Sequence, residues 1–429
     1  MFSYDYLILL SNILIVAVPV HSQSKPSLGI SSCYYVGDVY VDCGSQNVSI
    51  AEIPKECTAI IVDGIDMTEK NKVKSPGEEK QFPADLDLIL KSSKNVFIFY
   101  GHHTEEEWAQ VLNTENDHKE KKLNEEMKAL KTYLDQHPGI KGLIIKNLEF
   151  DANSTNVSNY SENLKVYLDA MRSNFPNMSI GLFLGGKFVV DQYNNPKLTW
   201  LNFTIIDPSV DFYIISVVTF NECTDQFRLL GTAPIGKLPS ITSTGVSQSN
   251  VSKISSTNST STGSTNSSST GSTNSSSTGS TNSSSTGSTN SSSTGSTNLT
   301  MPDTNYTLSN LVGILEDIFV PPNKTYYMYR LGPLSNDNST KAMCETTVTK
   351  ICLNSTDSSS WCYETIDSFN AKGEFAKDNG AGFVVNSIKI DDPKNVCKCG
   401  PYPSFNAILD GFNGNKSNIT KECALSNRS

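Results

Sequence analysis

The sequence has no excess of basic residues, and this lack excludes whole classes of partner. Its 429 residues include 34 Lys and Arg against 44 Asp and Glu, a formal net charge of −10. No stripe of Lys or Arg interrupts this balance, so the basic footprint that nucleic-acid binding requires is absent. The same balance disfavours an anionic membrane surface. We therefore expect no nucleic-acid partner.

Common catalytic and cofactor signatures are also absent from the sequence. It contains no phosphate loop, no dinucleotide fingerprint and no Gly-x-Ser-x-Gly motif. Cys397 and Cys399 are only one residue apart, and no Cys-x-x-Cys partner pair suggests zinc. His102, His103 and Glu105 have no evident further ligand, and adjacent strand residues diverge, so we interpret the histidines as a loop pair. We expect no metal and no cofactor.

The one long hydrophobic run lies near the first residue. Residues 7–20 are too few to span a bilayer comfortably, and Val20 and Ser22 are small residues suited to cleavage after Ser22. We predict a signal peptide over 1–22, with an uncleaved anchor as the alternative because Asp5 replaces the usual basic residues. No second apolar run or apolar tail suggests a membrane anchor. The expected location is therefore secreted and extracellular.

Cysteines and glycosylation sequons agree with secretion. All 10 cysteines follow the predicted signal, and their even number is typical of disulfides. The sequence also has 20 Asn-x-Ser/Thr sequons, a density typical of a heavily glycosylated protein. The predicted acceptors include Asn47, Asn153, Asn177, Asn202, Asn258, Asn266, Asn274, Asn282, Asn290, Asn323, Asn354 and Asn415.

A low-complexity segment divides the chain. Residues 240–303 are almost entirely Ser, Thr, Asn and Gly, and an eight-residue repeat runs from Ser256 to Gly295. Such a composition has no apolar face, so we predict a disordered insert, either a mucin-like brush or a tolerated loop expansion. The flanking parts, 23–239 and 304–429, would then form one domain around a shared core.

Strand-like runs alternate with amphipathic helical stretches on both sides of the insert. This alternation predicts a parallel sheet, and eight strands with this bulk favour a closed (β/α)8 TIM barrel, an α/β fold. The predicted strands are 33–36, 58–62, 96–100, 142–148, 179–184, 212–218, 325–329 and 382–390.

Several stretches are similar, in order and spacing, to one family. Residues 33–35 and 57–61 look like its first two strands, and 380–392, followed by Cys399, like its last strand and closing helix. In these features the chain resembles glycoside hydrolase family 18, the chitinases and chitinase-like lectins. The resemblance implies a Cys33–Cys57 and a Cys352–Cys399 disulfide, with Cys397 as competitor in the second. The other cysteines cannot be paired from the sequence.

The resemblance also implies a catalytic motif, which this sequence lacks. The family uses a Glu general acid, the substrate's own N-acetyl group, and supporting Asp and Tyr residues. The motif acids align with Lys141, Ile144, Lys146 and Leu148, and strand six carries Val218 and Thr219 where the family has Tyr and Asp. None of these can act as the acid. The alternative is a bulge that turns Glu149 inward, with Asp151 on the same face.

The family's sugar-stacking Trp residues are replaced as well. Those positions fall near His103, on Asn147 and on Asn386, and we place Tyr100 and Phe220 near the groove, so these five are the candidate ligand-binding residues. The resemblance thus implies a monomeric, non-hydrolytic chitinase-like protein that binds chitin, another N-acetylglucosamine-containing glycan or a cell-surface receptor. The alternatives are a mucin-like surface glycoprotein and an active glycosidase with relocated carboxylates.

Overall fold

The computed structural model describes most of the chain outside the insert. The described residues are 25–35, 48–68, 72–74, 81–112, 119–149, 159–195, 201–224, 227, 231–236, 306–335, 347–353, 361–417 and 423–425. The chain divides into two units, Met1–Leu238 with Asp303–Ser429, and Pro239–Pro302. The second unit lies outside the described residues, as do the octapeptide repeat and the signal segment, so disorder and cleavage there stay predictions.

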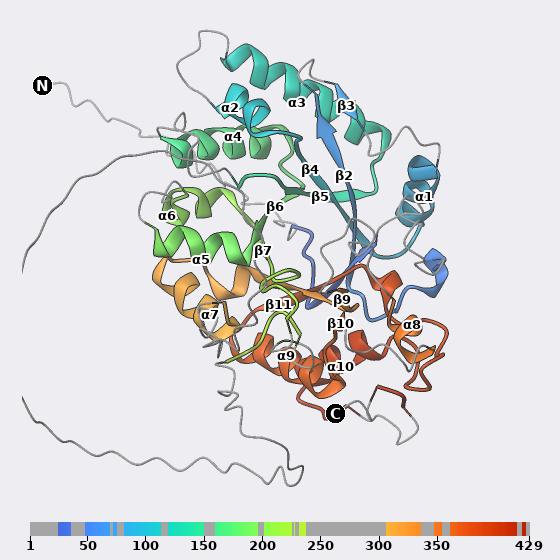
Figure 1. Cartoon of the computed structure of the whole chain (residues 1–429). Coiled ribbons are helices and arrows are strands. Elements are labelled where there is room, and N and C mark those ends of the chain that lie inside the picture. Colours follow the sequence, from blue (N-terminus) through green and yellow to red (C-terminus); the bar gives the residue numbers. More distant parts are fainter. Residues whose placement is uncertain are drawn as a thin grey trace, which may run out of the picture. The chain divides into compact units, whose positions relative to one another are not determined.

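Eight parallel strands close into a barrel, which confirms the predicted fold (Figure 1). The last barrel strand pairs with both the first strand and the seventh, so the sheet has no open edge among these eight. All eight strands lie within or overlap the ranges predicted from the sequence. They are β1 (Ser31–Tyr35), β2 (Ala59–Met67), β4 (Asn95–His102), β5 (Ile140–Ile145), β6 (Ser179–Gly185), β7 (Phe212–Ser216), β8 (Thr325–Arg330) and β11 (Gly382–Asn386).

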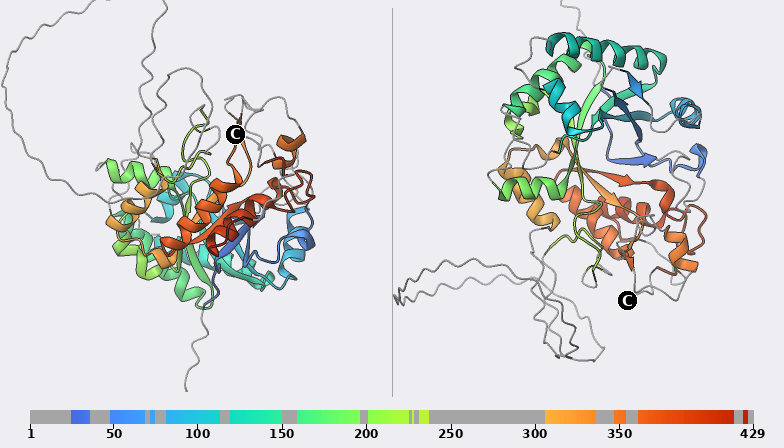
Figure 2. Two further views of the ribbon diagram at one scale, coloured as in Figure 1. Left: turned by 90° about the horizontal axis from the view of Figure 1, so that it is seen from below. Right: turned by 45° about the horizontal axis from the view of Figure 1, so that its top comes forward.

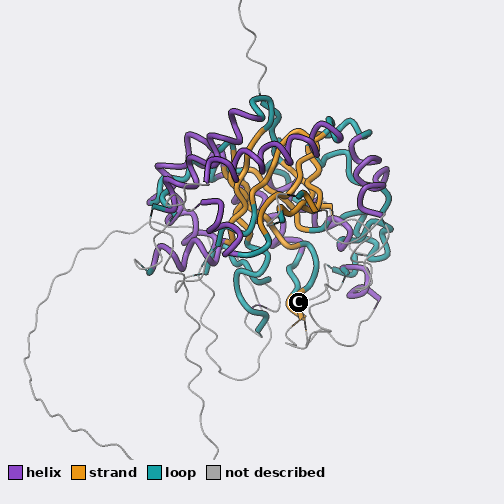
Figure 3. Tube along the Cα trace, turned by 90° about the horizontal axis from the view of Figure 1, so that it is seen from above, coloured by secondary structure: helices purple, strands orange, loops and turns teal. Residues whose placement is uncertain are grey.

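Helices surround the strands, which lie in the middle of the domain in the Cα trace of Figure 3. Figure 2 shows α9 and α10 side by side, where Gly373 and Gly411 let the two backbones approach closely. Short strands β3 (Val73–Lys74), β9 (Leu334–Ser335) and β10 (Trp361–Cys362) lie outside the barrel wall. The helices are α1 (Gln81–Leu90), α2 (Glu105–Leu112), α3 (Lys119–Gln136), α4 (Tyr160–Asn174), α5 (Gly186–Asn194), α6 (Phe203–Ile206), α7 (Leu308–Asp317), α8 (Val348–Leu353), α9 (Ile366–Asp378) and α10 (Pro403–Phe412).

The period-two alternation of each strand separates two apolar layers. One face packs against the helices, and the other fills the barrel interior with residues such as Leu28, Phe97, Phe212 and Val384. The Phe97 and Phe212 rings meet edge to face with centroids 5.6 Å apart. Leu28 precedes the first strand and belongs to the same cluster, so the interior is packed near the strand starts and a cavity is left at their other ends.

The two chain segments that flank the insert meet at its base. The Leu308 N–H donates to the Pro234 carbonyl, and the Ser309 N–H donates to the Ile235 carbonyl, both at 2.9 Å. The Asn221 Nδ2 group joins them further by donating to the carbonyls of Thr232 and Tyr306. The chain segment that follows the insert therefore lies next to the segment that precedes it.

The disulfides correct one expected pairing. Cys33 is bonded to Cys57, as the resemblance implied. Cys352 is bonded to Cys397 and not to Cys399, which pairs with Cys423. Lys398, between the two, has a left-handed backbone with φ of 59°, so the chain turns there and its neighbouring cysteines meet different partners.

A fourth bridge, which the sequence did not allow us to assign, joins Cys223 to Cys362. Cys43 and Cys344 lie outside the described residues. Within the described part of the chain, every helix is too short or too polar to cross a membrane.

Candidate functional site

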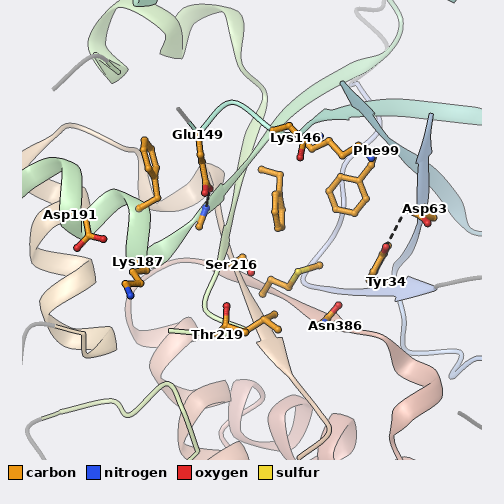
Figure 4. Close-up of a pocket in the computed structure, with 16 residues that line it drawn as sticks. Tyr34, Asp63, Phe99, Lys146, Glu149, Lys187, Asp191, Ser216, Thr219 and Asn386 are labelled. Atoms are coloured by element: carbon orange, nitrogen blue, oxygen red, sulfur yellow. Dashed lines mark hydrogen bonds between the residues drawn. The ribbon is translucent and has the colours of Figure 1, made fainter. Parts of the chain in front are cut away.

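A cavity of about 710 Å³ opens at the carboxyl ends of the barrel strands, a size typical of ligand pockets (Figure 4). In a TIM barrel this end carries the functional site. Seven of the eight barrel strands contribute at least one lining residue, and the segment that follows β5 contributes Lys146, Asn147 and Glu149. The lining residues are Tyr34, Asp63, Phe99, Lys146, Asn147, Glu149, Phe183, Gly185, Lys187, Phe188, Asp191, Ser216, Val218, Thr219, Met328 and Asn386.

Two acids of β2 face the barrel interior, and a bulge lies between them. The register with β4 shifts between Val62 and Ile65, which interrupts the period-two alternation. Asp63 lines the cavity on the same face as Ala59 and Ile61. The bulge turns Asp66 to this face too, and its carboxylate forms an ion pair with Lys146 past the intervening strand β4, Oδ1 to Nζ 3.1 Å. Asp63 is held by the Tyr34 hydroxyl at 3.3 Å and by the Gly64 N–H at 2.7 Å.

Lys146, which the resemblance aligned with one of the motif acids, is thus half of an ion pair. Small residues make room for it, because a Cβ added to Gly64 would lie 2.9 Å from the Lys146 ammonium. A Cβ added to Gly101 would similarly meet the Lys146 carbonyl at 2.7 Å. Ile144, the neighbouring motif position, is fully buried in the barrel interior, whereas Lys141 is exposed.

The strand alternation ends at Asn147, and this changes which residues face the cavity. Asn147 has a left-handed backbone with φ of 60°, and its side-chain Nδ2 donates to the His102 carbonyl at 2.9 Å. Leu148 is consequently buried in the layer between strands and helices. The alignment predicted Leu148 on the cavity face, and this placement is wrong: Glu149 lines the cavity instead.

Glu149 is the acidic residue that the bulge hypothesis singled out. Its Oε1 accepts a short hydrogen bond from the Gly185 N–H. Although the residue is exposed overall, burial around its carboxylate raises the pKa of Glu149, and the Gly185 hydrogen bond opposes this rise. Asp151, its suggested partner, lies outside the described residues.

Helix α5 supplies two further charged residues of the cavity, Lys187 and Asp191, and both contact Tyr306. Tyr306, the first described residue after the insert, donates a short hydrogen bond from its hydroxyl to Asp191 Oδ1. The Lys187 ammonium lies 5.5 Å from the centroid of the same ring. In Figure 4, Lys187, Asp191 and Glu149 are gathered on one side of the cavity, opposite Tyr34 and Asp63.

Apolar and aromatic groups form the middle of the cavity. Phe99 meets Tyr34 edge to face with centroids 5.4 Å apart, and meets Phe183 in the same way at 5.2 Å. Phe188 of α5 and Met328 of β8 extend this surface. Aromatic faces are a suitable surface for the apolar face of a sugar ring, and polar groups around them can take its hydroxyls.

The five predicted ligand-binding residues are only partly brought together. Asn147 and Asn386 line the cavity, as do Val218 and Thr219, the strand-six residues. His103 is exposed and is not among the lining residues. Phe220 was expected at the groove, but it is buried against Tyr306 and is also not a lining residue.

Tyr100 was also expected near the groove, but it faces the helices. Its hydroxyl, that of Tyr167 and the Nε2 atom of His102 all contact Oε1 of the buried Glu126. The loss of water and the nearby Glu126 charge raise the pKa of Tyr100 well above its usual value. The cluster is therefore part of the packing between β4, α3 and α4 rather than of the cavity.

Sequence reasoning missed Asp63, Asp66, Lys187 and Asp191. The signal for Asp63 was present, because it directly follows the predicted strand 58–62 and so lies at the carboxyl end of a parallel strand. Asp191 could not be found in this way, because it reaches the cavity from a helix.

The fold is similar to that of solved chitinases. Catalytic domain 2 of the Ostrinia furnacalis group II chitinase, solved as a mutant with a penta-N-acetyl chitooligosaccharide, has a TM-score of 0.60 and 12% identity, covering 92% of this chain and 99% of that one. Human YKL-39, described as a pseudo-chitinase with retained chitooligosaccharide binding, has a TM-score of 0.57 and 12% identity, covering 90% and 99%. The immunomodulatory chitinase TsES1 of Trichuris suis has a TM-score of 0.57 and 10% identity, covering 89% and 99%.

At these identities the likeness establishes the fold, which both active chitinases and a pseudo-chitinase share. No family model matches the sequence, and no curated protein does.

Proposed function

We propose that this chain is a secreted, glycosylated chitinase-like protein that binds N-acetylglucosamine-containing oligosaccharides without hydrolysing them. The observation that carries the proposal is the cavity at the carboxyl ends of the strands, with an aromatic middle and polar sides. The described binding of chitooligosaccharides by a pseudo-chitinase of the same fold gives further support.

The absence of hydrolysis is inferred from the residues around Glu149. A substrate-assisted mechanism needs a carboxylate beside the acid and a Tyr that steadies the intermediate. Here the two inward motif positions carry Ile144 and the ion-paired Lys146, and Val218 takes the place of the Tyr. Gly185 holds the Glu149 carboxylate from one side, and among the described residues no second carboxylate contacts it.

Binding is tested by titrating the purified chain with N-acetylglucosamine oligomers of increasing length, by calorimetry. Replacing Phe188→Ala should weaken binding about three- to tenfold, because it removes a stacking surface in the cavity. The matched control is Tyr193→Ala on the same helix, whose hydroxyl bonds Asp317 outside the cavity. Unchanged affinity in the first variant, or equal losses in both, would contradict binding in this cavity.

A working glycosidase is the second candidate, and one observation favours it. Glu149 faces the cavity with a pKa raised by burial, which is a property that a general acid needs. We expect no hydrolysis of chitin oligomers between about pH 3 and about pH 9. Turnover that Glu149→Gln abolishes would refute our proposal and establish this candidate.

Secretion and glycosylation are part of the proposal. The predicted acceptors within the described residues, Asn177, Asn202, Asn323 and Asn415, are all exposed, which attachment of a glycan requires. A secreted product that begins at Gln23 and carries glycans on these residues is expected. A glycan array with and without residues 240–303 separates a lectin from a mucin-like glycoprotein, whose properties would depend on the insert alone.

A further inference from the structure

The charges that line the cavity are unequal. Three carboxylates, those of Asp63, Glu149 and Asp191, face two ammonium groups, those of Lys146 and Lys187. The carboxylates come from both sides of the cavity, across an apolar middle (Figure 4). A ligand long enough to span the cavity would therefore meet negative charge at each end.

Neutral groups hold each of the three carboxylates by one oxygen. Oδ1 of Asp63 accepts from the Tyr34 hydroxyl and the Gly64 N–H, and Oδ1 of Asp191 accepts from the Tyr306 hydroxyl. Oε1 of Glu149 accepts from the Gly185 N–H. In the described part of the chain the second oxygen of each has no hydrogen-bond donor, and none of the three forms an ion pair.

The two ammonium groups do not compensate these carboxylates. Lys146 is neutralised by Asp66, which belongs to the ion pair and not to the cavity lining. Lys187 lies over the Tyr306 ring, a contact that keeps its positive charge. The cavity therefore keeps an excess of two negative charges, three from the carboxylates against one from Lys187, in a chain whose own net charge is −10.

From this arrangement we infer that the cavity selects amine-bearing glycans, namely β-1,4-linked glucosamine oligomers from which acetyl groups have been removed. The inference rests on the proposed function, because it names the class of sugar that the same cavity prefers. A protonated sugar amine can donate up to three hydrogen bonds to the open carboxylate oxygens and pairs with their charge. An N-acetyl group offers a single N–H and no charge.

The alternatives fit the cavity less well. Glycans with carboxylate or sulfate groups would meet like charge at both ends, which costs binding energy. Neutral sugars could use their hydroxyls as donors to the same oxygens, but without the Coulomb attraction. The preference for the amine should therefore depend on salt, whereas binding of the neutral sugar should not.

The test compares two oligomers of equal length, one fully acetylated and one fully deacetylated, by calorimetry in low and high salt. At a pH low enough to protonate the sugar amine, the deacetylated oligomer should bind about tenfold more tightly in low salt, and this advantage should shrink in high salt. The advantage should also disappear at alkaline pH. The double variant Glu149→Gln and Asp191→Asn should remove most of this advantage, so that the two oligomers bind with similar affinity, and it should remove the salt dependence of the difference.

The matched control removes the same charge far from the cavity. Glu125→Gln with Asp135→Asn lies on the outer face of α3, and it should leave both affinities unchanged if the effect is local. Equal affinity for the two oligomers, or tighter binding of the acetylated one, overturns the inference and leaves the proposed function standing. Binding of neither oligomer overturns both.

Discussion

Removal of the Ser/Thr/Asn/Gly-rich insert should stabilise the barrel slightly. The structure locates the joint, because the backbone hydrogen bonds Leu308 to Pro234 and Ser309 to Ile235 fasten the two ends at 2.9 Å. A variant that replaces residues 240–303 by four glycines keeps both bonds. It shortens the loop that these bonds close by a factor of about 5 to 6, and a loop-closure cost that scales as (3/2)RT ln n falls by about 1.5 kcal/mol.

The assay is thermal unfolding by calorimetry, with both proteins deglycosylated in the same way. For a domain of this size the gain corresponds to a rise in Tm of about 2–3 °C with cooperativity preserved. A second variant, lacking only the repeat 256–295, shortens the loop about twofold and should gain about 0.7 kcal/mol. The two gains therefore follow the logarithm of loop length.

Two results would refute this reasoning. A fall in Tm of several degrees, or an insoluble product, would mean that the insert packs on the barrel. Gains that track the number of deleted residues linearly would point to an interaction along the insert in place of chain entropy.

Three further predictions concern the barrel itself. Burial raises the pKa of Asp391 to about 6 despite hydrogen bonds from the Ser404 and Phe405 N–H groups, so the fold favours the protonated acid. The protonated acid contributes up to about 3 kcal/mol to the free energy of unfolding; this contribution is complete below about pH 4 and is lost as pH rises through about 6. Urea unfolding measured across this pH window should show the loss, and Asp391→Asn should remove this pH dependence. The Cys223–Cys362 disulfide spans 139 residues, so replacing both cysteines by Ala should lower the free energy of unfolding by up to about 5 kcal/mol in the same assay. An unchanged urea midpoint would contradict this disulfide. Gly181→Ala places a Cβ 2.1 Å from the Phe212 ring and should lower the free energy of unfolding by about 1–3 kcal/mol. Gly313→Ala in α7 meets nothing within 4 Å and should raise it by about 0.5–1 kcal/mol. Equal effects of the two substitutions would refute the packing argument.

The barrel was predictable because its strands follow the simple period-two rule. In β4, for example, Phe97 and Phe99 face the interior while Val96 and Ile98 face the helices, and both faces are apolar as a doubly covered parallel strand requires. The insert did not obscure this pattern, since β7 and β8 pair across it from Tyr213 and Thr325 onward.

The site was less predictable because it lies where that rule fails. The bulge after Val62 brings Asp63 and Asp66 to the same side, and the left-handed Asn147 exchanges the faces of Leu148 and Glu149. Neither irregularity can be located from the sequence alone. Asn tolerates a positive φ, but most Asn residues do not adopt one, so Asn147 does not stand out. Alternation carried through these points therefore assigns the wrong residue to the cavity.

Because Lys146 is paired with Asp66, the charged positions of the cavity cannot be considered one at a time. A carboxylate inside a barrel needs donors or a cation, and here Lys146 supplies the cation for Asp66 at 3.1 Å, with about a quarter of each side chain exposed. Placing an acid there by Lys146→Asp would set two carboxylates against each other and remove the only ion-pair partner of Asp66 among the described residues. The catalytic constellation that the resemblance implies would also require changes at Ile144 and Val218. The cavity is thus organised around its present charges, as the proposed binding function requires.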